Sequence, residues 1–261
     1  MAVQIVWQEL VSDVLIWGLL FMLLYSIQQK LLSRYKEKAI QESTATKEVV
    51  KHDKQVVDQI SRQFMSFVFS VVASYKTVDY LVRPDEDAMH LFIYQLVAYM
   101  VVDTCGIAWA FVNGKMISRD ATMIIHHIIF GVITLWFISF PELKIFTSDI
   151  VVPLLAAEAS TIFLNSRWMA IHIFKLSEKN VLVKGLSIAF VLCFVIVRIV
   201  GYFALLVSLV VQAKTHYSSM DKMTYIVTTC VIGSGWILNL YWLSLVFKAM
   251  QNAKPSSKKV S

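Results

Sequence analysis

Residues 123 to 131 read MIIHHIIFG, so two adjacent histidines, His126 and His127, stand inside an apolar run. Histidine is polar, titrates near neutral pH and is costly to bury without a partner. The apolar run continues to Phe140, and about 20 mostly apolar residues suffice to cross a hydrocarbon layer of about 30 Å as a helix. The sequence therefore places the histidine pair inside a predicted membrane span.

The composition favours a membrane protein over a soluble one. Of 261 residues, 57% are hydrophobic and 16% are charged, whereas soluble domains carry about 25% charged residues. The net charge of +6 comes from short basic segments between apolar runs, so we expect contact with a lipid bilayer and none with nucleic acid. The three cysteines lie in apolar stretches without disulfide or metal-ligand spacing, and we expect no metal site.

Seven segments are long and apolar enough to be predicted spans. They run from Val6 to Gln28, Gln63 to Val82, Met89 to Val112, Thr122 to Phe140, Ile150 to Ile171, Leu186 to Val211 and Thr224 to Phe247. We therefore expect an all-α multi-pass membrane protein in which one anchor helix precedes a six-helix bundle. The predicted divisions are an N-terminal anchor (1–30), a polar linker (31–58), the bundle (59–250) and a tail (251–261).

Basic residues are distributed unevenly between the two sides of the predicted spans. Seventeen follow the odd-numbered spans and four lie on the other side, which predicts a cytosolic linker and a cytosolic C-terminus. The chain ends SSKKVS, and Lys258 and Lys259 resemble the dilysine signal that a coat protein reads for retrieval to the endoplasmic reticulum. A solvated basic tail is the alternative reading of the same residues.

Several polar residues are predicted to lie at a similar depth in different spans. At a rise of about 1.5 Å per residue, His126 lies roughly 10 Å, Glu158 roughly 13 Å and Asp103 roughly 15 Å from the cytosolic boundary. Arg198 lies deeper, at roughly 20 Å. Ionisable groups within spans usually face the interior of the bundle, so we expect one polar layer in its cytosolic half.

The fifth span carries the longest polar stripe, in PLLAAEASTIFLNSRWMAI (153–171). Helical spacing places Glu158, Thr161, Asn165 and Trp168 on one face, and Ser160, Leu164 and Arg167 on a neighbouring face. Such a stripe would be unfavourable against lipid, so it must face other helices or a wet cavity. Pro153 is expected to kink this helix.

Acyl transfer is one chemistry that such a layer could perform. A neutral histidine acts as a general base or nucleophile when a carboxylate orients its other nitrogen, and Asp103 and Glu158 are candidates for that carboxylate. An acyl chain would lie in the apolar bundle, while acyl-CoA would enter from the cytosol. The alternative is an intramembrane hydrogen-bond network that fixes helix packing.

Four blocks together resemble the TLC domain family, which includes the ceramide synthases and a group of small TLC domain-containing proteins. The blocks are YMVVDTCGI with Asp103, TMIIHHIIFG with the histidine pair, the pattern E-x-S-x(4)-N-x-R from Glu158 to Arg167, and FVIVRI with Arg198. The resemblance covers roughly residues 58 to 250. It implies a TLC-type bundle, a location in the endoplasmic reticulum and the handling of acyl lipids.

The resemblance also implies roles for particular residues. The paired histidines are catalytic in ceramide synthases, which would carry over onto His126 and His127. Ceramide synthases also have an acidic H-D-x-x-D element after the arginine, but here the stretch reads RWMAIHIFKLSEKN, with Ile173 after His172. The small TLC proteins, which are linked to membrane lipid composition, fit better.

The sequence thus predicts a protein of membrane lipid homeostasis that binds or acylates a lipid, with acyl-CoA as the co-substrate of an acyltransferase and no bound cofactor. The predicted catalytic residues are His126, His127 and Asp103, and the predicted substrate-binding residues are Glu158, Ser160, Thr161, Asn165, Arg167 and Arg198. The alternatives are a ceramide-synthase-like N-acyltransferase and a non-catalytic lipid sensor or cargo adaptor. A seven-helix receptor has little support, and a homodimer stays open.

Overall fold

The computed structural model describes residues 11–12, 15–16, 18–20, 22–27, 29–30, 33–34, 47–112, 118–138, 150–211, 213 and 222–252. Regular structure within these ranges is helical and contains no strand, which confirms the predicted all-α fold class. The described residues of the predicted anchor are themselves helical. Lys258 and Lys259, which form the proposed retrieval signal, lie outside the described residues.

The helices follow one another along the chain as the apolar pattern predicts. They are α2 (Lys47–Val82), α3 (Glu86–Val112), α4 (Ser118–Ile138), α6 (Val152–Ala156), α7 (Glu158–His172), α8 (Val181–Phe194), the π-helix η3 (Val195–Val200), α9 (Gly201–Val211) and α10 (Lys222–Asn252). Helix α2 continues through residue 58, where the sequence analysis divides linker from bundle.

Three helical segments of the described residues are long and apolar enough to cross a membrane: Asp87–Ala108, Val181–Val211 and Lys222–Met250. Shorter apolar helical segments cover Gly18–Ile27 and Thr122–Gly131. The chain is therefore an all-α membrane protein, and the count of seven spans stays a prediction. Large apolar side chains exposed on these helices fit a protein surrounded by lipid, because lipid tails do not drive apolar side chains inward as water does.

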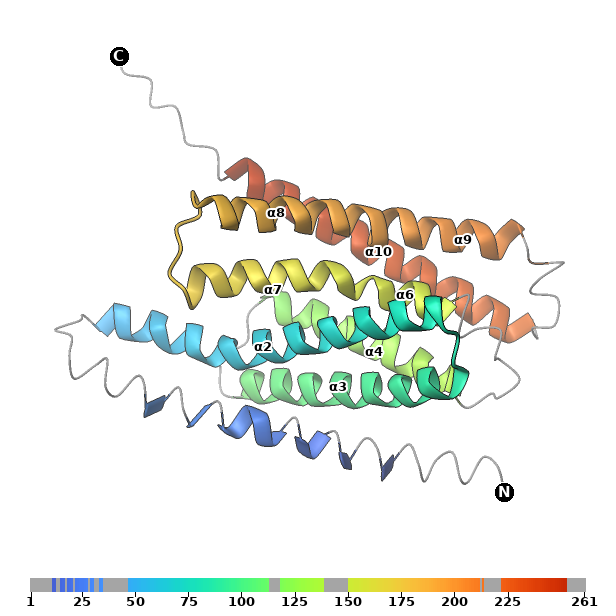
Figure 1. The fold of residues 1–261 in the computed structure, drawn as a ribbon, viewed down its shortest axis with the longest axis horizontal. Coiled ribbons are helices and arrows are strands. Elements are labelled where there is room, and N and C mark those ends of the chain that lie inside the picture. The colour runs from blue at the N-terminus through green and yellow to red at the C-terminus, as the bar shows by residue number, and fades with distance from the viewer. Residues whose placement is uncertain are drawn as a thin grey trace, which may run out of the picture. The chain divides into compact units, whose positions relative to one another are not determined.

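The described chain divides into two compact units, Met1–Cys193 and Phe194–Ser261. In the first unit α2 packs along α7 and also contacts α6 and α3, while α3 packs on α4 (Figure 1). Stacked rings join α2 to α3, since the centroids of Phe69 and Tyr99 lie 4.1 Å apart with an interplanar angle of 2°. Helix α2 therefore connects α3 with α6 and α7 within this unit.

The predicted fifth span is interrupted at Ala157, which separates α6 from α7. Pro153 stands in the first turn of α6, where its missing N–H is tolerated. The interruption follows four residues later, where the Ser160 hydroxyl donates to the Ala157 carbonyl at 2.9 Å and competes with the backbone ladder. Glu158 consequently stands in the first turn of α7, where a carboxylate interacts favourably with the helix dipole.

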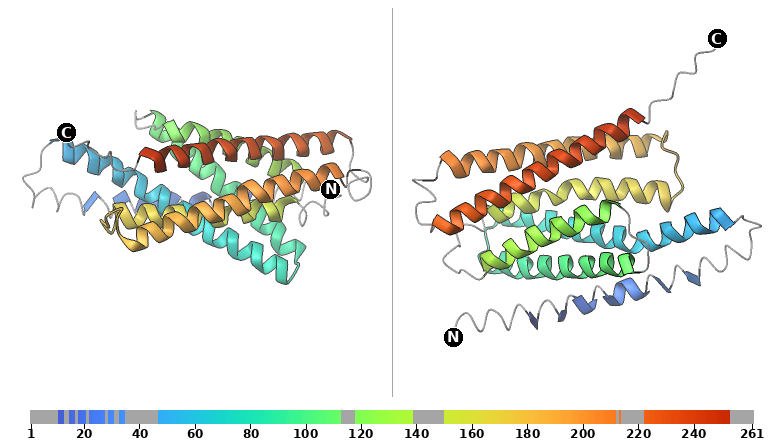
Figure 2. Two further views of the ribbon diagram at one scale, coloured as in Figure 1. Left: turned by 90° about the horizontal axis from the view of Figure 1, so that it is seen from above. Right: turned by 180° about the vertical axis from the view of Figure 1, so that it is seen from behind.

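The second unit contains η3, α9 and α10 (Figure 2). The Trp236 indole N–H donates to the Ile199 carbonyl at 3.1 Å, and the Tyr225 hydroxyl donates to the Leu209 carbonyl at 3.2 Å. Residue numbers rise along α10 as they fall along η3 and α9, so these helices pack antiparallel. The Trp236 contact falls on a π-helical carbonyl, where the wider turn disturbs the regular backbone ladder.

Candidate functional site

His127 is held between two neighbouring residues of α3. Its side chain is 5% exposed, its Nδ1 lies 3.1 Å from the Thr104 hydroxyl, and its Nε2 lies 3.8 Å from Asp103 Oδ2. If the hydroxyl donates to Nδ1, the proton of the neutral ring sits on Nε2 and faces the carboxylate. Both ring nitrogens therefore have neighbours on α3, and the predicted association of Asp103 with a histidine is present.

Asp103 also faces a cation from α2. Arg62 Nε lies 3.7 Å from Asp103 Oδ1, and the two side chains are 18% and 12% exposed. The carboxylate therefore lies between the arginine and the histidine, with one oxygen toward each. Glu158 also interacts electrostatically with His127, as do Asp103 and Arg62.

Two serines of α2 connect this group to α7. Asn165 Nδ2 donates to the Ser66 hydroxyl at 3.0 Å, and the Ser70 hydroxyl lies 3.2 Å from Glu158 Oε2. The Ser70 hydroxyl also lies 2.7 Å from the Ser66 carbonyl, so its single proton is shared between two acceptors. Ser70 and Asn165 are fully buried, which makes these contacts part of the helix interface.

Tyr99 fills the space between α2 and the histidine. Its ring stacks on Phe69 and meets the His127 ring edge-on at a centroid distance of 6.3 Å, and its side chain hydrogen-bonds to that of Ser66. A buried tyrosine of this kind combines apolar packing with a polar end that needs a partner. We call the connected residues the polar cluster: Arg62, Ser66, Ser70, Tyr99, Asp103, Thr104, His127, Glu158 and Asn165.

His126 adjoins the polar cluster but has different surroundings. Its ring lies 5.7 Å from the His127 ring and 4.6 Å from the Phe130 ring, both centroid distances. The side chain is half-buried, whereas that of His127 is buried. Of the two histidines, His126 is thus the less buried.

Ser160 and Thr161 lie on α7 with Glu158 and Asn165. Ser160 is buried, and its hydroxyl donates within its own helix, to Ala157. Thr161 is half-buried. The structure thus brings Glu158 and Asn165 to α2 and gives Ser160 a contact within its own polypeptide segment.

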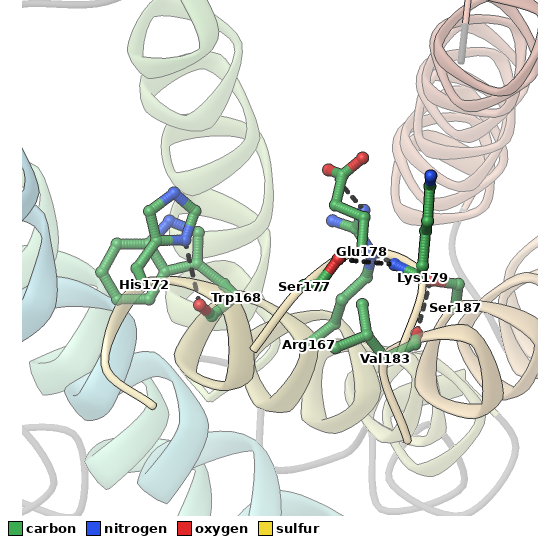
Figure 3. Close-up of polar contacts among 8 residues, drawn as sticks. All are labelled: Arg167, Trp168, His172, Ser177, Glu178, Lys179, Val183 and Ser187. Carbon is green, nitrogen blue, oxygen red and sulfur yellow. Dashed lines mark hydrogen bonds and ion pairs between the residues drawn. The ribbon is translucent and has the colours of Figure 1, made fainter. Parts of the chain in front are cut away.

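Arg167 points to a different neighbour than Asn165 does. Its Nε donates to the Ser187 hydroxyl on α8 at 2.8 Å, and its Nη2 lies 3.5 Å from the exposed Glu178 carboxylate (Figure 3). Two positions separate Arg167 from Asn165, and residues two apart on a helix do not share a face. Of these two predicted substrate-binding residues, Asn165 thus contacts α2 and Arg167 contacts α8.

Arg198 belongs to the second unit and contacts other residues of that unit. It is buried in η3, its Nη1 lies 3.5 Å from Asn239 Oδ1, and its guanidinium lies 5.6 Å from the Phe194 ring centre and 5.9 Å from that of Trp242. Aromatic faces stabilise a delocalised cation, which explains how a charge is accommodated within an apolar helix.

The contribution of α2 to the polar cluster is not predicted from the sequence. Arg62, Ser66 and Ser70 recur every four residues and therefore share a helix face, which was the available signal. The predicted topology places Arg62 among the basic loop residues. Thr104 and Tyr99 flank Asp103 on one helix, but no pattern in the sequence singles them out.

The polar cluster offers a histidine, two carboxylates, hydroxyls and an arginine between apolar helices. These groups can bind the polar end of an amphipathic molecule, take up a proton or stabilise a developing negative charge. In the part of the chain that the structure describes, no three His, Cys, Asp or Glu side chains come together as a metal site. The side chains of the polar cluster themselves support acid–base chemistry and hydrogen bonding.

Apolar helices that enclose such a cluster define a multi-pass membrane protein with an internal polar site. The family model of the TLC domain matches residues 55–248, so the chain belongs to the TLC domain family. The resemblance drawn from the sequence motifs is thereby confirmed, and the family connects the chain with membrane lipids. No curated protein matches the chain in a direct sequence comparison.

Proposed function

We propose that this protein acts in membrane lipid homeostasis by binding or acylating an acyl lipid whose polar end lies at the polar cluster. The observation that carries the proposal is the position of His127 between Thr104 and Asp103, inside a helical membrane protein. The acyl chain would lie among the apolar helices, where contact with hydrocarbon is favourable. The cluster would then supply the hydrogen bonds that the lipid's polar end loses on leaving water.

As an acyltransferase, the protein would transfer the acyl group of an acyl-CoA to a lipid amine or hydroxyl. The acceptor atom attacks the thioester carbonyl, the carbon–sulfur bond breaks, and coenzyme A leaves. A histidine accepts the proton of the acceptor and returns it to the departing thiolate. Alternatively, the histidine first takes the acyl group itself.

The surroundings of the two histidines suggest a division of labour in that reaction. His127 is fixed by Thr104 and Asp103, so it suits a positioning role. His126 is half-buried and adjoins it, so it suits contact with the substrate. Asp103 would orient His127, and Arg62 would hold the carboxylate in place.

A lipid sensor or cargo adaptor without catalysis is the second candidate. The contacts of Ser66 with Asn165 and of Ser70 with Glu158 favour it, because they fix helix packing without any substrate. The ceramide-synthase alternative is less favoured. Its acidic element is missing, and the one matching histidine, His172, stacks on Trp168 and has Nδ1 3.0 Å from the Trp168 carbonyl.

The location proposed for this function is the endoplasmic reticulum membrane, with a cytosolic C-terminus. The basic residues on that side of the predicted spans and the Lys258–Lys259 ending support it. Coat-protein recognition of the tail belongs to the same proposal.

The test is acyl transfer by purified, reconstituted protein. Labelled acyl-CoA is supplied with a mixed pool of sphingoid bases and lysophospholipids, and product and retained lipid are both measured by mass spectrometry. The H126A/H127A double variant is compared with wild type, and H172A is the matched control because it removes a histidine outside the polar cluster.

Three outcomes are distinguishable when all proteins remain folded. Product from wild type and H172A alone makes the protein an acyltransferase, and the labelled acceptor identifies its substrate. Lipid retained by wild type and H172A, without product from either, makes it a lipid sensor. If wild type shows neither product nor selective lipid retention, the proposal is overturned.

A further inference from the structure

The turn between α7 and α8 combines exposed lysines with exposed apolar side chains. We call residues 173–184 the α7–α8 corner. Lys175, Lys179 and Lys184 are exposed there, together with Glu178. Phe174 and Val181 are 70% and 85% exposed, and Ile173 and Leu182 are also exposed. A surface of this composition is typical of segments that lie in the headgroup layer of a bilayer.

The position of the corner along the chain supports the same placement. Val181 begins the apolar helical segment Val181–Val211, which is long enough to cross a membrane. The residues just before it therefore lie at the end of a candidate span. The lysines there are at the level of lipid phosphates, and Phe174 and Val181 can reach the upper part of the acyl region.

Arg167 presents a fixed cation to this surface. The Ser187 hydroxyl donates to the Val183 carbonyl at 2.8 Å and accepts from Arg167 Nε at 2.8 Å. These two contacts fix one edge of the guanidinium against α8. The side chain remains 34% exposed, and a guanidinium has five N–H donors. Several donors therefore remain on its outer edge for an anion.

Glu178 is the anion that now faces that edge. Its Oε1 lies 3.5 Å from Arg167 Nη2, and its side chain is 70% exposed. Exposed ion pairs at such distances are weak and easily exchanged. Figure 3 shows the ends of Glu178 and Lys179 on the same side of the loop as the Arg167 guanidinium. A phosphate that displaced Glu178 would gain two-pronged hydrogen bonding from the arginine and lie near Lys179.

We propose that the α7–α8 corner binds the headgroup phosphate of an anionic phospholipid, with Arg167 as the phosphate ligand and Glu178 as its built-in competitor. Lys175, Lys179 and Lys184 supply the general attraction to anionic lipid, which is about equal for each basic residue near a membrane surface. The exposed Phe174 and Val181 favour a lipid over free phosphate, because a soluble anion gives these side chains nothing to contact.

This site is separate from the polar cluster. Arg167 contacts Ser187 on α8 and Glu178 in the corner. The experiment at this site measures the retention of an intact phospholipid and not the formation of an acylated product. Failure of the acyl-transfer assay would leave this proposal unaffected, and failure here would leave the polar cluster unaffected.

The experiment is a lipid titration of the purified full chain in neutral detergent, followed by native mass spectrometry. Dioleoyl phosphatidylserine is compared with dioleoyl phosphatidylcholine, and inorganic phosphate is added as a competitor. The variants are R167Q, R167K and E178Q. K248Q is the control, because Lys248 is an exposed lysine on α10, far along the sequence from the corner.

Wild type and K248Q are expected to prefer phosphatidylserine about 10-fold, which corresponds to about 1.4 kcal/mol. R167Q should lose that preference, and R167K should keep part of it because it retains the charge but not the planar fork. E178Q should bind phosphatidylserine several-fold more tightly. That gain cannot come from misfolding, so it keeps the test valid if R167Q is unstable.

Two results would overturn the proposal. One is an unchanged preference in folded R167Q together with unchanged binding in E178Q. The other is displacement of phosphatidylserine by millimolar inorganic phosphate, which would show an anion site without lipid contact.

Discussion

Asn165 on α7 donates a hydrogen bond of 3.0 Å to the hydroxyl of Ser66 on α2, across 99 positions of sequence. The Ser70 hydroxyl and Glu158 connect the same two helices one turn further along α2. Lipid offers no hydrophobic force between helices, so polar contacts and close packing must determine how such helices associate. The partner of α7 is thus defined by two hydrogen-bonded side-chain pairs.

A double-mutant cycle should show that Ser66 and Asn165 are coupled. S66A and N165A are each expected to lower the free energy of unfolding by about 1 kcal/mol, because S66A removes the acceptor of the buried Asn165 amide and N165A removes the donor to the Ser66 hydroxyl. The coupling energy should be about 0.6–1.7 kcal/mol, the range for hydrogen bonds between membrane helices. Unfolding in mixed detergent micelles measures both quantities.

S244A is the control for that cycle, since the Ser244 hydroxyl is exposed and bonds within its own helix. It should change the unfolding free energy little. Strict additivity of S66A and N165A would show that the observed hydrogen bond contributes nothing to helix association.

Removing the Thr104 hydroxyl should impair the function proposed for His127. T104V keeps the side-chain shape but removes the contact to Nδ1, so product formation or lipid retention should fall about 10-fold, the equivalent of one hydrogen bond of about 1.4 kcal/mol. T104S restores a hydroxyl and should recover most of the signal. Thermal unfolding of both variants separates loss of function from loss of fold. A T104V protein as active as wild type would remove Thr104 from the positioning role.

Cysteine labelling should distinguish lipid-facing from water-facing positions. Cys105 lies in the candidate span Asp87–Ala108 and Cys230 in Lys222–Met250, and both side chains are exposed on their helices. In a bilayer these thiols face acyl chains. Because maleimides react with the thiolate and a thiol among acyl chains stays protonated, a charged maleimide should label them slowly in intact membranes and rapidly after detergent and denaturation. Rapid labelling by the charged reagent in membranes would contradict the assignment of these two helices as spans.

Arg198 and Asn239 should behave as a coupled pair within the second unit. N239L removes an acceptor from a buried guanidinium, and R198L removes a donor from a buried amide, so each should cost about 1–3 kcal/mol of unfolding free energy. The R198L/N239L protein should lose less than the sum of the two, because both polar groups are then replaced by apolar ones. A loss equal to the sum within about 0.5 kcal/mol would show that the two residues act independently.

The sequence alone predicts the helical class and the residue types of the site, because apolar run lengths and helical spacing are local properties. Asp103 and His127 come together as expected, since consecutive spans pack as neighbours. Periodicity defines the face on which a residue lies but not the helix that meets this face. The role of Ser66 and Ser70 could therefore not be predicted from the stripe that contains Glu158 and Asn165.

The π-helix at Val195–Val200 shows a second limit of local pattern. Phe194, Arg198 and Tyr202 are all buried at intervals of four, a spacing that a regular α-helix also places on one face. Hydropathy does not distinguish a π-turn from an α-turn, so the placement of Arg198 beside Asn239 needed the structure.

The contacts of α2 also define a sequence of events during synthesis. A chain is made from its N-terminus, so Arg62, Ser66 and Ser70 leave the ribosome before the residues of α3 and α7 that contact them. Tyr99 and Asp103 of α3 follow first, while Glu158 and Asn165 follow only after the histidine helix has been made. Helix α2 thus gains its contacts with α3 first and its contacts with α7 later. The histidine helix α4 is translated between these two steps.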